Sequence, residues 1–224
     1  MKHLFRVQPE DLAEHYPSRA EHWADFWVHM VGIVVFGVGA LVLFVLALLN
    51  GGVSMAAATA IYAACLLGLL ATSAIYNLRK PCPKRRLFRK LDEAAIFLLI
   101  AGSYTPFTTQ RFEGGWALGM TAAVWIAAFA GVFAKLFLHR VPEWAWSLVY
   151  IAFGWLIVVA LKPLIAGVSL VALILLAIGG ILYTVGVPFF LWQSLPYRRA
   201  IWHTFVVAAA ATHFAAVVTG VVLA

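Results

Sequence analysis

The chain has 224 residues, of which 64% are hydrophobic and only 11% are charged. A soluble domain averages about 45–50% apolar and about 25% charged residues, so this composition excludes both an ordinary soluble protein and an intrinsically disordered one. The net charge of +7 would suit a nucleic-acid-binding protein, but the basic residues lie in short groups between apolar runs. That pattern is typical of membrane topology, and we expect a membrane protein that binds no nucleic acid.

Seven apolar runs are long enough to cross a hydrocarbon layer about 30 Å thick as helices. The runs cover approximately 28–49, 53–76, 92–109, 116–138, 145–165, 167–192 and 201–223. The fifth and sixth runs nearly touch, and we place the break between them at Lys162-Pro163, because proline disfavours a continuous helix. The sequence thus predicts an all-α membrane protein, with a seven-transmembrane helix bundle over residues 25–224. Residues 1–24 form an N-terminal segment in which we expect a short interfacial helix.

The positions of the basic residues predict how the bundle is oriented. With the N-terminus in the cytoplasm, 14 Lys and Arg residues lie on the cytoplasmic side and 2 lie outside. Half of the 14 fall in the connector 78–90 alone. Since cytoplasmic loops carry the excess of basic residues, the N-terminus is predicted to be cytoplasmic and the C-terminus to lie outside.

Five polar residues are predicted to lie at one depth, near the cytoplasmic ends of three runs. Ser73 and Asn77 end the second run, four residues apart and so on one helical face. Asp92 opens the third run, while Arg199 and His203 open the seventh. If these runs are neighbours, the five side chains form one cluster in the inner leaflet. We favour a functional role for Asp92 with His203, because a buried acid and a buried imidazole are costly in lipid.

Other polar residues in or near the runs suit structural roles better. We expect Lys135 to extend its amine to the inner headgroups. Glu93 suits the start of a helix, where the helix dipole favours an acidic residue. His213 lies ten residues beyond His203, about 15 Å further along a helix, so we expect it to bond a neighbouring carbonyl instead of joining the cluster.

Three sequence strings resemble the hemolysin III family, the bacterial branch of the progestin and adipoQ receptor superfamily. They are Ser73-Ala-Ile-Tyr-Asn77, the stretch 90–107 that begins Lys-Leu-Asp-Glu and ends Ser-Tyr-Thr-Pro-Phe, and the stretch 196–206 that contains Arg199 and His203. The resemblance covers the chain from about His29 to its end. It implies a seven-helix bundle in the bacterial cytoplasmic (inner) membrane, with an inner-leaflet cavity that can hold zinc.

The resemblance also implies a zinc-ligand set that this sequence lacks in part. The family ligands are the His of a Ser-x3-His motif and both His of a His-x3-His pair, with an Asp that holds the zinc-bound water. Ser73, Asp92 and His203 match that pattern, but Asn77 and Arg199 stand where two of the imidazoles belong. Since Asn is a poor zinc ligand and Arg is none, Asp92 and His203 would make an incomplete metal site. We therefore expect no cofactor, and we hypothesise that the Arg199 guanidinium supplies the positive charge that zinc supplies in relatives.

Two functions remain open from the sequence. The first is a non-enzymatic membrane protein that senses or buffers lipid state, with membrane lipids as its partners and with Asn77 and Arg199 in its cavity wall. The alternative is a metal-dependent hydrolase of a lipid amide or ester, in which Ser73, Asp92 and His203 would be catalytic. We prefer the first because the zinc ligands are missing. A channel is disfavoured, because the polar residues lie at one leaflet and do not extend across the membrane.

Overall fold

A computed structural model of the chain describes residues 12, 14–138 and 141–224. The described part is helical and contains no strand. The helices are α1 (Arg19–Leu78), α2 (Arg85–Gln110), α3 (Gly114–Phe137), α4 (Glu143–Gly154), α5 (Leu161–Gly167), α6 (Leu170–Leu191) and α7 (Arg198–Val217). A 3₁₀ segment, Trp155–Ala160, joins α4 to α5, and a π-helical turn, Val218–Val222, extends α7.

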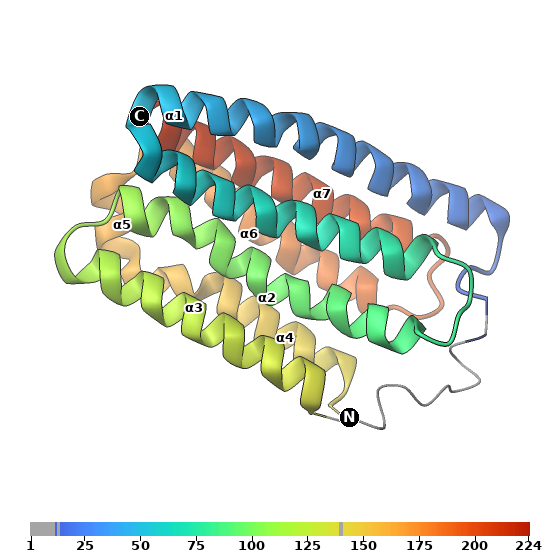
Figure 1. Cartoon of the computed structure of the whole chain (residues 1–224). Helices are drawn as coiled ribbons and strands as arrows, with labels where there is room; N and C mark the ends of the chain where they lie inside the picture. The colour runs from blue at the N-terminus through green and yellow to red at the C-terminus, as the bar shows by residue number, and fades with distance from the viewer. Residues whose placement is uncertain (1–11, 13, 139–140) are drawn as a thin grey trace.

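Helix α1 consists of two helical segments that meet at Gly52. Its 60 residues would extend about 90 Å as a straight helix, about three times the thickness of the hydrocarbon layer. Gly52 has φ 66° and ψ −160°, a conformation open to glycine and strained for other residues. The chain reverses direction there, so the two segments lie side by side as a hairpin (Figure 1). The sequence predicted this break, since Asn50-Gly51-Gly52 separates the first two apolar runs.

Five helical stretches of the described chain are long and apolar enough to cross a membrane. They are Arg19–Leu78, Gly114–Phe137, Glu143–Gly167, Leu170–Leu191 and Arg198–Val222. Helix α2 is not among them, because charged residues in its first turns and polar residues in its last turns lower its mean hydropathy. A multi-pass membrane protein follows from these helices, while the count of seven spans and the orientation of the termini stay predictions.

The predicted helix break at Lys162-Pro163 is wrong. Both residues lie inside α5, where Pro163 belongs to the first turn and removes no intrahelical hydrogen-bond donor. The break falls instead at Val168 and Ser169, and the Ser169 hydroxyl caps α6 by accepting from the backbone N–H of Ala172 at 3.3 Å.

The boundary predicted at residue 25 lies inside α1. This helix begins at Arg19, and the Ser18 hydroxyl caps it by accepting from the Glu21 N–H at 3.2 Å. The interfacial helix expected in residues 1–24 falls mostly on residues 1–11 and 13, which lie outside the described part of the chain.

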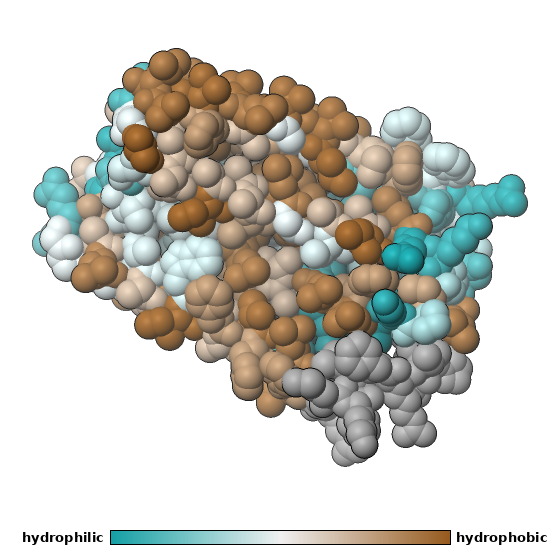
Figure 2. Space-filling view, in the orientation of Figure 1, coloured by the Kyte–Doolittle hydropathy of each residue, from teal (hydrophilic) through white to brown (hydrophobic). Residues whose placement is uncertain are grey.

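The helices pack so that four helix ends meet at one end of the bundle. Helix α1 packs against α2 and α7, α2 packs against α3, and α6 packs against α7. Both ends of α1 and the beginnings of α2 and α7 lie together on the right in Figure 1. Hydrophilic residues gather at that end in Figure 2, while hydrophobic residues cover much of the face between the two ends. Such an apolar belt is what lipid contact requires.

Close contact between α1 and α2 depends on Gly102. A Cβ at this position would lie 2.8 Å from Cys65 Cβ and 3.6 Å from the Tyr62 Cα. In membranes, small residues at such crossings let backbones approach and gain dispersion energy. No atom lies within 4 Å of a Cβ built on Gly119, an exposed position of α3.

We therefore predict that Gly102→Ala lowers the free energy of unfolding by about 1–3 kcal/mol, the usual cost of overpacking. The matched variant Gly119→Ala makes the same change of helix propensity without a clash, so it should be neutral or slightly stabilising. Thermal unfolding of both variants in detergent measures the difference. Equal unfolding temperatures would contradict the close packing of α1 and α2.

Candidate functional site

A cluster of polar side chains surrounds the hydroxyl of Ser73, near the end of α1. The Nε2 atoms of His29 and His203 lie 3.2 Å and 3.4 Å from Ser73 Oγ, and Asn77 Nδ2 lies 3.3 Å from it. Asp92, in the first turns of α2, lies within hydrogen-bonding reach of the same hydroxyl. We call the following residues the polar cluster: Asp25, His29, Ser73, Asn77, Asp92, Arg199 and His203.

The structure brings all five residues singled out in the sequence into this cluster. Arg199 Nη1 donates to Asn77 Oδ1 at 3.2 Å, and Asn77 Nδ2 donates to the Ser73 backbone oxygen at 3.0 Å. Ser73, Asp92 and His203 are linked to them as described above, and all five line one cavity. Helices from three parts of the chain therefore meet at this cluster, as expected for neighbouring runs, while the depth of the cluster in the membrane stays a prediction. The catalytic and cavity roles of these side chains stay predictions.

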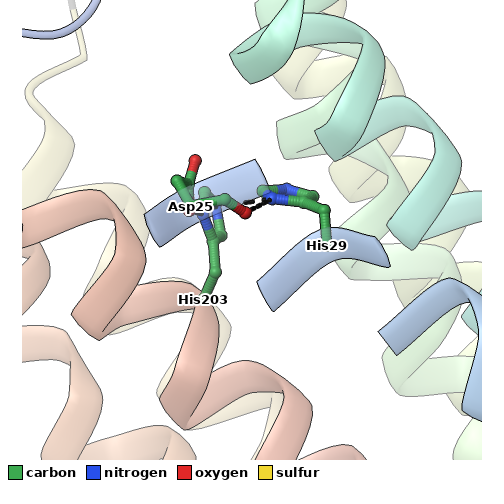
Figure 3. Close-up of side chains that lie close together, drawn as sticks. All are labelled: Asp25, His29 and His203. Atoms are coloured by element: carbon green, nitrogen blue, oxygen red, sulfur yellow. Dashed lines mark hydrogen bonds and ion pairs between the residues drawn. The ribbon is translucent and has the colours of Figure 1, made fainter. Parts of the chain in front are cut away.

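Sequence reasoning missed the residues that α1 contributes from its beginning. Asp25 is 0% exposed, and its Oδ1 lies 2.6 Å from His203 Nδ1. His29, which is also buried, places Nδ1 2.8 Å from the backbone oxygen of Asp25. Figure 3 shows these side chains turned toward one another from α1 and α7. The spacing of Asp25 and His29, four residues apart at the start of an apolar run, was the signal that could have found them.

Tyr16 holds the second oxygen of the Asp25 carboxylate. Its hydroxyl donates a hydrogen bond to Asp25 Oδ2. Burial, together with the charge of the nearby Asp25 carboxylate, raises the pKa of Tyr16 well above its usual value. The phenol therefore remains protonated and remains a donor, so both oxygens of Asp25 have partners.

The zinc ligands implied by the family resemblance do not fit this chain. Asn77 and Arg199 occupy two of the three positions, and they are hydrogen-bonded to each other. A guanidinium has no lone pair to offer a metal, and its positive charge repels one. Of that ligand set, His203 alone can coordinate a metal ion.

A network of ion pairs lies beside the polar cluster and corrects the expectation for Lys135. Its Nζ lies 2.6 Å from Glu93 Oε2 and 4.5 Å from the centre of the Trp146 ring. Arg89 pairs with Glu93 at 3.0 Å and with Glu143. Only 8% of the Lys135 side chain is exposed, so it points into the bundle and does not extend to the headgroups. The expected role for His213 agrees with its position 3.3 Å from the Leu176 carbonyl oxygen.

The ion-pair network and the polar cluster, apart from Asp25, line a cavity of about 390 Å³. Its remaining wall is largely apolar and comes from several helices, with Ile100 in α2, Ile151 in α4, Val187 in α6 and Val206 in α7. A volume of this size lies within the range of small-molecule sites, which typically join apolar walls to a few placed polar groups.

The chain is similar to one known family over most of its length. The family model described as "Haemolysin-III related" matches residues 18–214. Hemolysin-3 of Bacillus cereus is 38% identical over 197 residues, which cover 87% of this chain and 89% of that protein. The Hemolysin-3 homolog of Bacillus subtilis (strain 168) is 40% identical over 55% of this chain and 58% of its own length. Human monocyte to macrophage differentiation factor is 31% identical over 58% of this chain and 54% of its own length.

We predict that Lys135→Met destabilises the protein by about 3 kcal/mol, because it leaves Glu93 with one buried oxygen unpaired. The double variant Lys135→Met/Glu93→Gln should regain part of that loss, since no carboxylate is then left uncompensated. Lys162→Met, at an exposed position of α5, is the matched control and should change little. Unfolding in detergent measures all three, and a Lys135→Met variant as stable as Lys162→Met would contradict the buried pairing.

Proposed function

The chain belongs to the haemolysin-III-related family of membrane proteins, and we propose that it binds a membrane lipid in its cavity and takes part in sensing or maintaining the lipid state of the bacterial inner membrane. The observation that carries the proposal is the cavity of about 390 Å³, with apolar walls and one polar end. An acyl chain suits the apolar walls. A headgroup or ester oxygens suit the donors at the polar end.

The charge pattern of the cavity supports an amphipathic ligand. Arg198 and Arg199 line the cavity from the start of α7, and neither forms an ion pair with a carboxylate of the described residues. Arg198 instead donates to the Phe190 carbonyl at 3.0 Å, and Arg199 donates to Asn77. Two guanidinium groups that bond only to neutral acceptors are suited to an anionic or strongly polar headgroup.

Sensing requires that the protein bind one kind of lipid more tightly than another, since a ligand without differential affinity shifts no equilibrium. The cavity wall draws side chains from α1, α2, α4, α6 and α7. A lipid chain that enters there contacts several helices at once. Its length or saturation would then alter how these helices pack.

We predict that a phospholipid carrying a photoreactive diazirine in its acyl chain labels the cavity-lining segments of α2 and α7 in reconstituted vesicles. Ile100→Trp fills part of the cavity and should lower this labelling several-fold. Ile126→Trp makes the same change at a 69% exposed position of α3 outside the cavity and should not. Competition by saturated and by monounsaturated lipid should differ by about tenfold or more, the scale on which a sensor discriminates. Equal labelling of both variants would refute lipid binding in the cavity, and equal competition would refute sensing.

A lipid amide or ester hydrolase is the second candidate function. The observation in its favour is the position of Ser73, whose hydroxyl lies between two imidazoles and near a carboxylate at the polar end of the cavity. Asn77 and Arg199 occupy the positions of two zinc-binding histidines, which argues against a metal-dependent hydrolase that uses the family's ligand set.

Our prediction for this candidate is negative. Purified protein incubated with a ceramide-like substrate and added zinc should release fatty acid no faster than its Ser73→Ala variant does. The Ser147→Ala variant, which changes a cavity-lining serine outside the polar cluster, is the control. Turnover by the wild type and by Ser147→Ala that Ser73→Ala abolishes would establish the hydrolase and displace the non-enzymatic proposal.

A further inference from the structure

Two imidazoles of the polar cluster together face three oxygens and share one of them, Ser73 Oγ, in a way that leaves one nitrogen lone pair without a donor. His203 faces Asp25 Oδ1 through Nδ1 and Ser73 Oγ through Nε2. His29 faces the Asp25 backbone oxygen through Nδ1 and the same Ser73 Oγ through Nε2. A neutral imidazole carries one N–H and one lone pair, and the Ser73 hydroxyl carries one proton.

No tautomer of the two neutral rings satisfies all of these contacts. If both rings carry hydrogen on Nδ1, two Nε2 lone pairs compete for the single proton of Ser73. If either ring carries hydrogen on Nε2, its Nδ1 lone pair faces an oxygen of Asp25 instead of a donor. One lone pair is therefore left without a donor among the described side chains in every case, which is costly for a buried polar atom.

The charges around Ser73 also indicate that the cluster lacks a cation. The polar cluster holds two carboxylates, Asp25 and Asp92, and one permanent cation, Arg199. With both carboxylates ionised and both imidazoles neutral, it carries one excess negative charge in a buried setting, which the surroundings must compensate. A cation between the two rings and Asp25 would supply the compensation and use the remaining lone pair.

We propose that Asp25, His29 and His203 form a site for a divalent transition-metal ion, held by Asp25 Oδ1 and the Nδ1 atoms of both imidazoles. Ligand atoms of the three residues all lie within 4.8 Å of one another. Asp25 Oδ1 lies 2.6 Å from His203 Nδ1 and 3.7 Å from His29 Nδ1. Zinc bonds of about 2.0–2.1 Å in tetrahedral geometry place ligand atoms about 3.3 Å apart, a value between these two distances.

Metal binding at the Nδ1 atoms would satisfy both imidazoles, while Asn77 Nδ2 keeps its bond to the Ser73 backbone oxygen. Both rings would then carry hydrogen on Nε2 and donate to the two lone pairs of Ser73 Oγ, while the Ser73 proton turns to Asp92. Tyr16 already holds Asp25 Oδ2, which orients the carboxylate and leaves Oδ1 for the ion. Such outer partners are the usual support of metal-binding histidines and carboxylates.

This ligand set is built from the contacts of this chain and differs from the one the family resemblance implies. Two of its three ligands come from the beginning of α1, and it shares only His203 with the family set. Two imidazoles and one carboxylate suit zinc, iron(II) or cobalt(II). His29 and His203 line the cavity, so water can complete the coordination.

The first test measures metal binding by the unmodified full-length chain, purified with a tag that contains no histidine. After treatment with a chelator and addition of Zn²⁺, we expect about one zinc ion per chain by elemental analysis and a higher unfolding temperature. Co²⁺ should give the intense visible absorption of a four-coordinate site. If the chain retains no zinc and shows no cobalt spectrum, the extra cation of the cluster is a proton and the proposal is overturned.

The second test locates the site. Asp25→Asn and His29→Gln should each lower zinc affinity at least about 100-fold, whereas Ser73→Ala removes an outer partner and should lower it about 10–100-fold. His213→Gln changes a half-buried histidine of the same bundle, which lies against the Leu176 carbonyl and the Tyr183 ring, and should bind zinc as the wild type does. Wild-type affinity in both ligand variants would place the metal elsewhere and refute this site. If Asp25→Asn does not fold, the cobalt spectrum of the wild type and the His29→Gln variant decide the question. None of these readouts depends on lipid, so they are independent of the proposed function.

Discussion

The contact between Asp25 and His203 joins the first helix to the last, across 178 positions of the sequence. A carboxylate that is 0% exposed inside a membrane protein must be fully partnered, because its desolvation costs several kcal/mol. Tyr16 and His203 supply the partners, and they fix the beginning of α1 against the beginning of α7. His29 follows one turn later in α1 and is thereby brought to Ser73. The rest of the polar cluster depends on this one placement.

Helix α2 separates the two groups of charges that share this end of the bundle. Asp92 and Glu93 are neighbours in sequence, but adjacent residues of a helix point about 100° apart. Asp92 accordingly reaches the Ser73 hydroxyl, while Glu93 pairs with Arg89 and Lys135. The cavity lies against both groups, so a ligand inside it meets donors and acceptors on two sides and apolar side chains elsewhere. That division places charged groups on two sides of a mostly apolar cavity.

Much of this arrangement could be predicted from local sequence signals, and the failures have physical reasons. Apolar runs predicted the helices because a long apolar helix is stable in the hydrocarbon layer, whichever helices lie next to it. Lys135 was assigned to the headgroups, since nothing in its own helix reveals that Glu93 of α2 lies beside it. Asp25 was not singled out, because it lies just before the apolar run that begins at residue 28, and hydropathy places the start of a span after such a charged residue. Pro163 was read as a helix end, yet in the first turn of α5 it costs the helix nothing.

Ser73 lies at the centre of one electrostatic arrangement. It includes Asn77 and Arg199, which replace the zinc ligands implied by the family resemblance, and the residues at the start of α1 that sequence reasoning missed. On one side of its hydroxyl, Asn77 and Arg199 bond to each other and present a fixed positive charge. On the other side, Asp25 presents a carboxylate oxygen to two imidazole nitrogens. A mobile cation is repelled from the first side and attracted to the second, with the Ser73 oxygen between them. With Asn at position 77 and Arg at position 199, the cluster can therefore still attract a cation. The carboxylate that attracts it is Asp25, at the beginning of α1.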